Sequence, residues 1–148
     1  MLGKTQAWLA NEARITPAVL QGLESSNRKL PDNLALSQVY AVLKAQGLEL
    51  IDATEEQGEG VLWREPTGRT WIEGLRHARA MLGLSLDEMA ELSAVGRDAI
   101  ARIERGGLKR TPEQSALKLR DALRMKGVII IPEDRDHGLG IRSLIMSK

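Results

Sequence analysis

The chain has 148 residues with 21 basic and 20 acidic side chains, so its net charge of +1 gives no indication of a polyanionic partner. It has no cysteine, which excludes disulfides and thiolate metal sites. No stretch approaches the ~20 apolar residues of a membrane span, and no signal-peptide pattern follows Met1. We therefore expect a cytoplasmic protein with no membrane partner.

The first half of the chain predicts three short helices followed by a pair of strands. Thr5 is a suitable N-cap for a first helix, Thr16 with the proline after it opens a second, and Pro31 opens a third. The segments 48–51 and 61–63 predict a β-hairpin. The acidic, glycine-containing turn between them is expected to be a solvated loop.

The second half follows a linker at 65–70 and predicts four helices and another hairpin. Thr70 is a plausible N-cap for the first of these helices. Ser85 and Glu88 form a capping box that starts the second helix, and Val95-Gly96 is expected to form the tight turn after it. The expected elements are helices over about 71–82, 86–94, 97–105 and 112–126, and strands over 128–131 and from Ile141.

The two halves repeat each other at a constant spacing of 80 residues. Identical pairs include Met1/Met81, Glu24/Glu104, Lys29/Lys109, Gly47/Gly127, Gly58/Gly138 and Gly60/Gly140. One offset over almost the whole length predicts duplication of a folding unit, with a first copy at 1–64 and a complete second copy at 71–148. The first copy lacks a counterpart of the helix at 71–80. Either that helix is missing from the protein, or the natural N-terminus lies upstream of residue 1.

Charge is distributed unevenly between the copies. Residues 1–68 contain six basic and nine acidic side chains, a net charge of −3, whereas residues 69–148 contain fifteen and eleven, a net charge of +4. The second copy is therefore the better candidate for binding a polyanion.

Residues 89–106 carry the pattern of two short helices joined by a tight turn, the second rich in outward polar residues, which predicts a helix-turn-helix. The segment resembles the lambda-repressor-like (XRE, Cro/CI type) helix-turn-helix family, and the resemblance covers 72–126. The tail at 127–142 is similar to a bacterial subgroup, of phage or mobile-element type, in which a hairpin follows the last helix. We expect a mainly α fold: two tandem lambda-repressor-like domains, each followed by a short β-hairpin.

The resemblance implies sequence-specific binding to double-stranded DNA. If Ile100 and Ile103 are buried, the arginines of the 97–105 helix face outward, where a guanidinium can bond guanine O6 and N7. One departure is Leu86, at a position where the family often carries glutamine. The residues expected to contact DNA are Ser85, Arg97, Asp98, Arg102, Arg105, Lys109 and Arg110 in the second copy, and Gln6, Thr16, Gln21, Arg28 and Lys29 in the first.

The resemblance also implies a largely buried ion pair between Arg79 and Glu104. The first copy keeps Glu24, the counterpart of Glu104, but has no counterpart of Arg79. Without a covering helix, its apolar side chains are expected to be partly exposed and to form an interface. A homodimer, a protein partner or the segment before Trp71 could cover it. The expected interface residues are Trp8, Leu9, Leu20, Leu23 and Glu24.

Two functions follow from these patterns. The first is a DNA-binding transcriptional regulator, with the second copy as principal reader and the first as a weaker reader or a dimerisation module. The alternative is a protein-interaction factor, such as an anti-activator or co-regulator, that keeps the helix-turn-helix fold. No nucleophile–base pair, metal cluster or phosphate loop predicts an enzyme, a cofactor or a small-molecule ligand.

Overall fold

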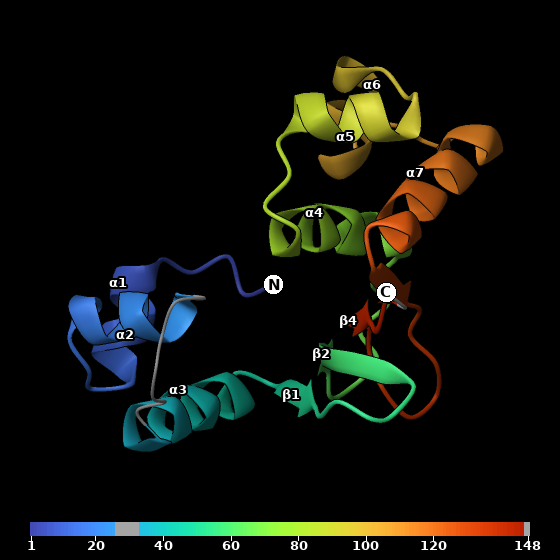
Figure 1. Ribbon diagram of the computed structural model, residues 1–148. Helices are drawn as coiled ribbons and strands as arrows, with labels where there is room; N and C mark the ends of the chain where they lie inside the picture. The colour runs from blue at the N-terminus through green and yellow to red at the C-terminus, as the bar shows by residue number, and fades with distance from the viewer. Residues whose placement is uncertain (26–32, 147–148) are drawn as a thin grey trace. The chain divides into compact units, whose positions relative to one another are not determined.

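The computed structural model describes residues 1–25 and 33–146, which form seven helices and four strands (Figure 1). The chain divides into two compact units, Met1–Glu49 and Leu50–Lys148. The described residues are a mixture of helix and strand, so the expected mainly α class is not confirmed. None of the helices in the described ranges is long and apolar enough to cross a membrane.

The first unit is built from α1 (Gln6–Glu12), α2 (Pro17–Glu24) and α3 (Asn33–Ala45), which pack on one another. The side chains of Thr5 and Thr16 cap α1 and α2 by accepting backbone N–H bonds of 3.1 Å and 3.2 Å, as their N-cap positions predict. The core consists of Ala10, Ala13, Leu20 and Val39, with Leu9, Ile15, Leu23, Val42 and Leu43 packed against it.

The helices of the second unit are α4 (Trp71–Met81), α5 (Leu86–Ser93), α6 (Arg97–Glu104) and α7 (Glu113–Met125). Helix α4 packs against α6, and α5 packs against both α6 and α7. Burial of large apolar side chains from all these helices stabilises the arrangement. The largest fully buried side chains are Leu75, Met89, Ile100, Ile103, Leu119, Leu123, Leu139 and Ile141.

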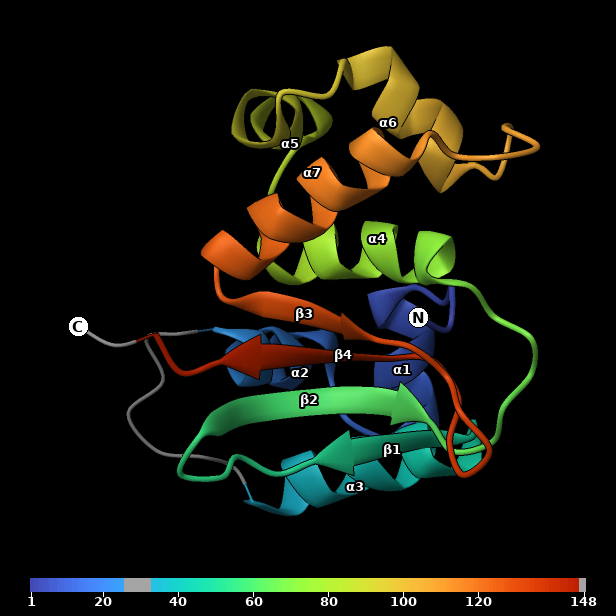
Figure 2. The same cartoon turned by 90° about the vertical axis from the view of Figure 1, so that its right-hand side faces the viewer.

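The strands β1 (Leu48–Ile51), β2 (Gln57–Trp63), β3 (Val128–Ile131) and β4 (Gly140–Leu144) form one sheet in the order β1-β2-β4-β3. The sequence predicted two separate hairpins, but β2 pairs antiparallel with β4 and joins them. Figure 2 shows β3, β4 and β2 side by side, with α4 next to β3. The boundary between the compact units lies at 49/50, not at the predicted 64, because β2 is hydrogen-bonded into the second unit.

The predicted linker at 65–70 is fixed to the hairpin of β3 and β4. The carboxylate of Glu133 accepts backbone N–H bonds from Thr67, Gly68 and Arg69 at 3.1, 2.9 and 3.3 Å. The guanidinium of Arg69 also lies over the ring of Trp63, 4.0 Å from its centroid. The segment between β2 and α4 is therefore an ordered part of the second unit.

Several elements recur at the spacing found in the sequence. Helices α2 and α3 and strand β1 begin and end 80 residues before α6, α7 and β3, respectively. Arg14 follows α1 and Ala94 follows α5, and both adopt φ +56°, a left-handed conformation uncommon for residues other than glycine. The turn between the two short helices therefore has the same backbone form in both halves.

Candidate nucleic-acid interface

The turn between α5 and α6 is held by hydrogen bonds from Ser93. Its buried hydroxyl donates to the carbonyl of Met89 at 2.7 Å and accepts from the N–H of Val95 at 3.2 Å. The left-handed residue is Ala94, whereas Gly96 has φ −59° and serves as the N-cap of α6. This turn fixes the direction in which α6 leaves α5.

Helix α6 buries one face and exposes an arginine-rich face. Ile100 and Ile103 are 0% and 1% exposed, which anchors the helix in the core. Arg97, Arg102 and Arg105 lie on the exposed remainder of α6 and its C-cap. Three guanidinium groups on one short exposed helix face can bind base edges or phosphates.

Arg97 is engaged by two acidic side chains. Its Nε lies 3.0 Å from Asp87 Oδ1, and its Nη1 lies 3.6 Å from Asp98 Oδ1. All three groups are exposed, and such pairs contribute only about 0–1 kcal/mol, so a phosphate or base can compete for Arg97. The sequence analysis missed Asp87. The signal that could have identified it is its place in the first turn of α5, where acidic residues are favoured.

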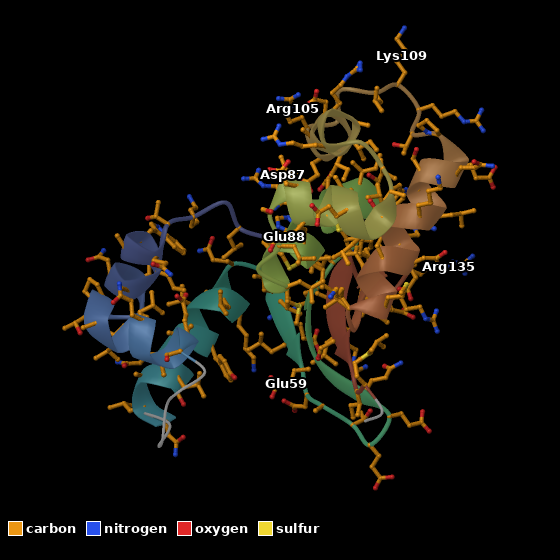
Figure 3. All side chains as sticks on the ribbon, turned by 45° about the horizontal axis from the view of Figure 1, so that its top comes forward. Glu59, Asp87, Glu88, Arg105, Lys109 and Arg135 are labelled. Carbon is orange, nitrogen blue, oxygen red and sulfur yellow. The ribbon has the colours of Figure 1, made fainter. Side chains whose placement is uncertain are left out.

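Basic side chains continue beyond α6. Lys109 and Arg110 are exposed on the loop that leads to α7, and Figure 3 shows Lys109 on the same outer end of the molecule as Arg105. Among the described residues, no acidic side chain forms an ion pair with Arg102, Arg105, Lys109 or Arg110. These four cations are therefore the most accessible charges of the face.

The N-terminus of α5 is closed by the predicted capping box. The N–H of Ser85 donates to Glu88 Oε2 at 2.7 Å, and the Ser85 hydroxyl oxygen accepts from the N–H of Glu88 at 3.1 Å. The hydrogen bond from the Ser85 backbone lowers the pKa of Glu88. Because the Ser85 hydroxyl oxygen is only an acceptor in the box, its proton is free to donate to a phosphate.

Arg79 and Glu104 form a bidentate ion pair that ties α4 to α6. The two nitrogen–oxygen distances are 2.7 and 2.9 Å, and Arg79 also donates to the carbonyl of Leu84 at 2.7 Å. The Arg79 and Glu104 side chains are 17% and 7% exposed. The hydrogen bond to Glu104 raises the pKa of Arg79. The pair fixes the C-terminal end of α6 close to the basic loop.

Residues 75–125 match the family model described as Helix-turn-helix. The match runs from within α4 to the end of α7 and includes the whole exposed face of α6. A helix-turn-helix domain is therefore present, and domains of this kind bind DNA in regulatory proteins. No curated protein and no solved structure gives a significant match.

The first unit has a different set of side chains at the positions equivalent to this face. Gln6, expected to contact phosphate, donates from Nε2 to Glu24 at 2.5 Å. The Thr16 oxygen caps α2, and Gln21 is exposed. The expected DNA contacts Arg28 and Lys29 lie outside the described residues.

The expected apolar interface of the first unit is only partly exposed. Leu20 is 2% exposed, so the expectation that it is uncovered is wrong, because α1, α2 and α3 bury it in their own core. Trp8, Leu9 and Leu23 are half-buried and Glu24 is exposed. Beside Trp8 lies a cavity of about 220 Å³, formed by the N-terminal residues, α1, Glu24, Leu43 and Leu48.

The two histidines are not part of a metal site. Within the described ranges, no three metal-ligating side chains come together. Burial lowers the pKa of His77 to about 4, so this side chain is neutral at pH 7. His137 Nε2 lies 3.1 Å from Asp134 within the turn of the second hairpin.

Proposed function

We propose that this protein is a sequence-specific, DNA-binding transcriptional regulator in which α6 is the recognition helix. The observation that carries the proposal is the exposed arginine face of α6, located within the segment that matches the helix-turn-helix family. In this class of domain the second helix enters the major groove. Arginine is the side chain that most often reads guanine there.

Each side chain of the face has a role in this proposal. Arg102, which has no acidic neighbour among the described residues, reads a base, and Arg97 exchanges its exposed carboxylate partners for a second base contact. Asp98 is placed to accept from a cytosine amino group. Phosphate contacts that fix the position on the duplex come from Ser85, Arg105, Lys109 and Arg110.

We also propose that the chain arose by tandem duplication of one helix-turn-helix unit. The support is the shared spacing of 80 residues between α2 and α6, α3 and α7, and β1 and β3. The left-handed residues Arg14 and Ala94 support the same correspondence. In this view the first copy kept the local geometry of the unit while its surface changed.

The first copy has two candidate roles. Auxiliary DNA contact would use Gln6, Thr16, Gln21, Arg28 and Lys29. The alternative is dimerisation or binding of a protein partner, and the cavity beside Trp8, with Glu24 at its rim, favours this second role. A hollow lined by half-buried apolar side chains is typical of an interaction surface. A factor that acts only through this surface is the alternative function.

The experiment that tests DNA binding begins with selection of a duplex from a randomised library. Affinity for that duplex is then measured between about 50 and 200 mM salt, because a protein that contacts phosphates loses affinity steeply over this range. Lys109→Ala should weaken binding to all sequences and reduce the salt slope by about 1. Arg135→Ala is the matched control, since Figure 3 shows this exposed arginine away from Arg105 and Lys109.

The result that contradicts the proposal is equally clear. If no duplex is enriched, or if the Lys109 and Arg135 variants bind the selected duplex alike, α6 and its basic loop are not the reader. The protein-interaction alternative would then account for the chain.

A further inference from the structure

The pairing of β2 with β4 is symmetric with respect to the sequence repeat. Val61 lies opposite Ile141, its own counterpart 80 residues later. On one side Gly60 lies opposite Arg142, and on the other Leu62 lies opposite Gly140. Because Gly140 is the counterpart of Gly60 and Arg142 that of Leu62, exchanging the two strands reproduces the same register. A local two-fold axis therefore passes between Val61 and Ile141.

Four glycines make this close pairing possible. A Cβ at Gly60 would lie 2.8 Å from the carbonyl oxygen of Ile141, and a Cβ at Gly140 would lie 2.7 Å from the Cβ of Leu62. Such contacts are too short to tolerate without movement of the opposite strand. The two glycines flank the axis at equivalent places.

The second pair of glycines repeats the relation one step further out. A Cβ at Gly58 would collide with the side chain of Ser143, and a Cβ at Gly138 would lie 2.6 Å from the Cβ of Trp63. Gly138 is the counterpart of Gly58, and Ser143 is the counterpart of Trp63. The repeated glycine pairs of the sequence therefore have a structural use that neither the hairpin turns nor the DNA-binding face explains.

The axis relates backbone positions, while the side chains around it have become different. Arg142 donates to the carbonyls of Gly58 and Asp52 at 2.8 and 3.1 Å, and Ser143 donates to the carbonyl of Glu59 at 3.0 Å. These bonds run from β4 to the first hairpin, and Leu62 cannot return the bonds of Arg142. Such one-sided contacts favour pairing of the two different strands over pairing of identical ones.

We infer that the β2–β4 seam is a two-fold interface between identical units that duplication has brought within one chain. This inference rests on the duplication proposed above. Two strands that merely happened to meet could pair in many registers, whereas a former homodimer must pair each residue of the seam with its own symmetry mate. A single chain is then the complete assembly, and the partner that the seam would accept is the β4 strand of a second copy of this chain.

The first test asks whether the seam closes within one chain. Because the natural chain has no cysteine, Val61→Cys/Ile141→Cys introduces a single directly opposed pair. Such cross-strand neighbours are close enough for a disulfide. After mild oxidation, light scattering and non-reducing electrophoresis should show a monomer of 16.3 kDa without free thiols. A covalent dimer would mean that β2 pairs with β4 of another chain, and would overturn the inference.

The second test opens the seam in the full-length chain. In a Gly58→Val/Gly60→Val background, both added side chains collide with β4 and should release it from β2. The free β4 should then pair with β4 of a second chain. In the two-fold register residue 141 lies opposite itself, whereas residue 143 lies opposite residue 139. Ile141→Cys should therefore form a disulfide-linked dimer several-fold more than the matched Ser143→Cys.

The outcomes separate cleanly. Without the valine substitutions neither single cysteine should form a dimer. Equal yields from the two cysteines in the opened background, or no dimer from either, would show that β4 has no self-complementary register and would overturn the inference. None of these readouts involves DNA, so failure of the seam and failure of DNA binding are distinguishable.

Discussion

The two helix-turn-helix-like regions of this molecule have nearly the same backbone but different polar chemistry. In the second, Glu104 is buried and receives a bidentate bond from Arg79. In the first, the equivalent Glu24 is exposed and receives a single bond from Gln6. The comparison teaches that short helices with suitable caps and a small apolar core suffice to form this arrangement, and that the buried ion pair is an added stabilisation of one region.

The exposed faces differ even more than the ion pairs. Helix α6 carries Arg97 and Arg102, whereas the same positions of α2 are Pro17 and Gly22. Neither proline nor glycine can donate a hydrogen bond from its side chain to a base edge. The same scaffold therefore presents a cationic surface in one region and a nearly neutral one in the other.

The largest expected effect comes from removing the buried ion pair. Arg79→Ala leaves Glu104 buried without its partner and should lower the free energy of unfolding by about 3 kcal/mol. Gln6→Ala, the corresponding change in the first unit, should cost less than about 1 kcal/mol because its partner is exposed. Urea unfolding followed by circular dichroism measures both. Equal losses would mean that the pair does not distinguish the two regions.

The second expected effect concerns DNA affinity. Arg102→Ala should weaken binding to the selected duplex by about 1–3 kcal/mol and relax the preference at one base position. Gln21→Ala, which removes an exposed side chain from α2, should change affinity by less than about 0.5 kcal/mol. Fluorescence anisotropy with single-base variants of the duplex measures this. A larger loss in the Gln21 variant would make the first unit the principal reader.

A third change sharpens the comparison by giving the first unit the arginine it lacks. Gly22 is the counterpart of Arg102, and no heavy atom lies within 4 Å of the place its Cβ would occupy. Gly22→Arg should raise the free energy of unfolding by about 0.5–1 kcal/mol, because glycine is a poor helix former. The salt slope of DNA binding then discriminates the two roles of the first copy. A steeper slope indicates DNA contact, and an unchanged slope indicates a protein-binding role.

The smallest effect is expected at the two left-handed residues. Ala94→Gly and Arg14→Gly remove a Cβ from residues with φ +56° and should each stabilise the protein by about 0.5 kcal/mol, after the entropy that glycine adds to the unfolded chain. Gly96→Ala is the control, since Gly96 has φ −59° and open space at its Cβ. If the Gly96 variant is the destabilised one in thermal unfolding, the strain lies at Gly96.

Local features of the structure could be predicted from the sequence because local interactions determine them. Thr5, Thr16 and Ser85 begin helices where their hydroxyl oxygens cap nearby backbone N–H groups. The alternation of Ile100 and Ile103 with arginines placed α6 with one face buried and one exposed. These signals extend over only a few residues, so one sequence is enough to read them.

Tertiary structure alone decided which distant segments meet. Nothing local to Asp87 or Arg97 shows that their side chains lie 3.0 Å apart, because the distance depends on the angle at which α5 meets α6. The joining of the two hairpins through β2 and β4 depends on backbone hydrogen bonds between strands about 80 residues apart. Backbone groups are the same in every residue, so the sequence recorded this pairing only as repeated glycines, whose purpose appears once the opposite strand is in place.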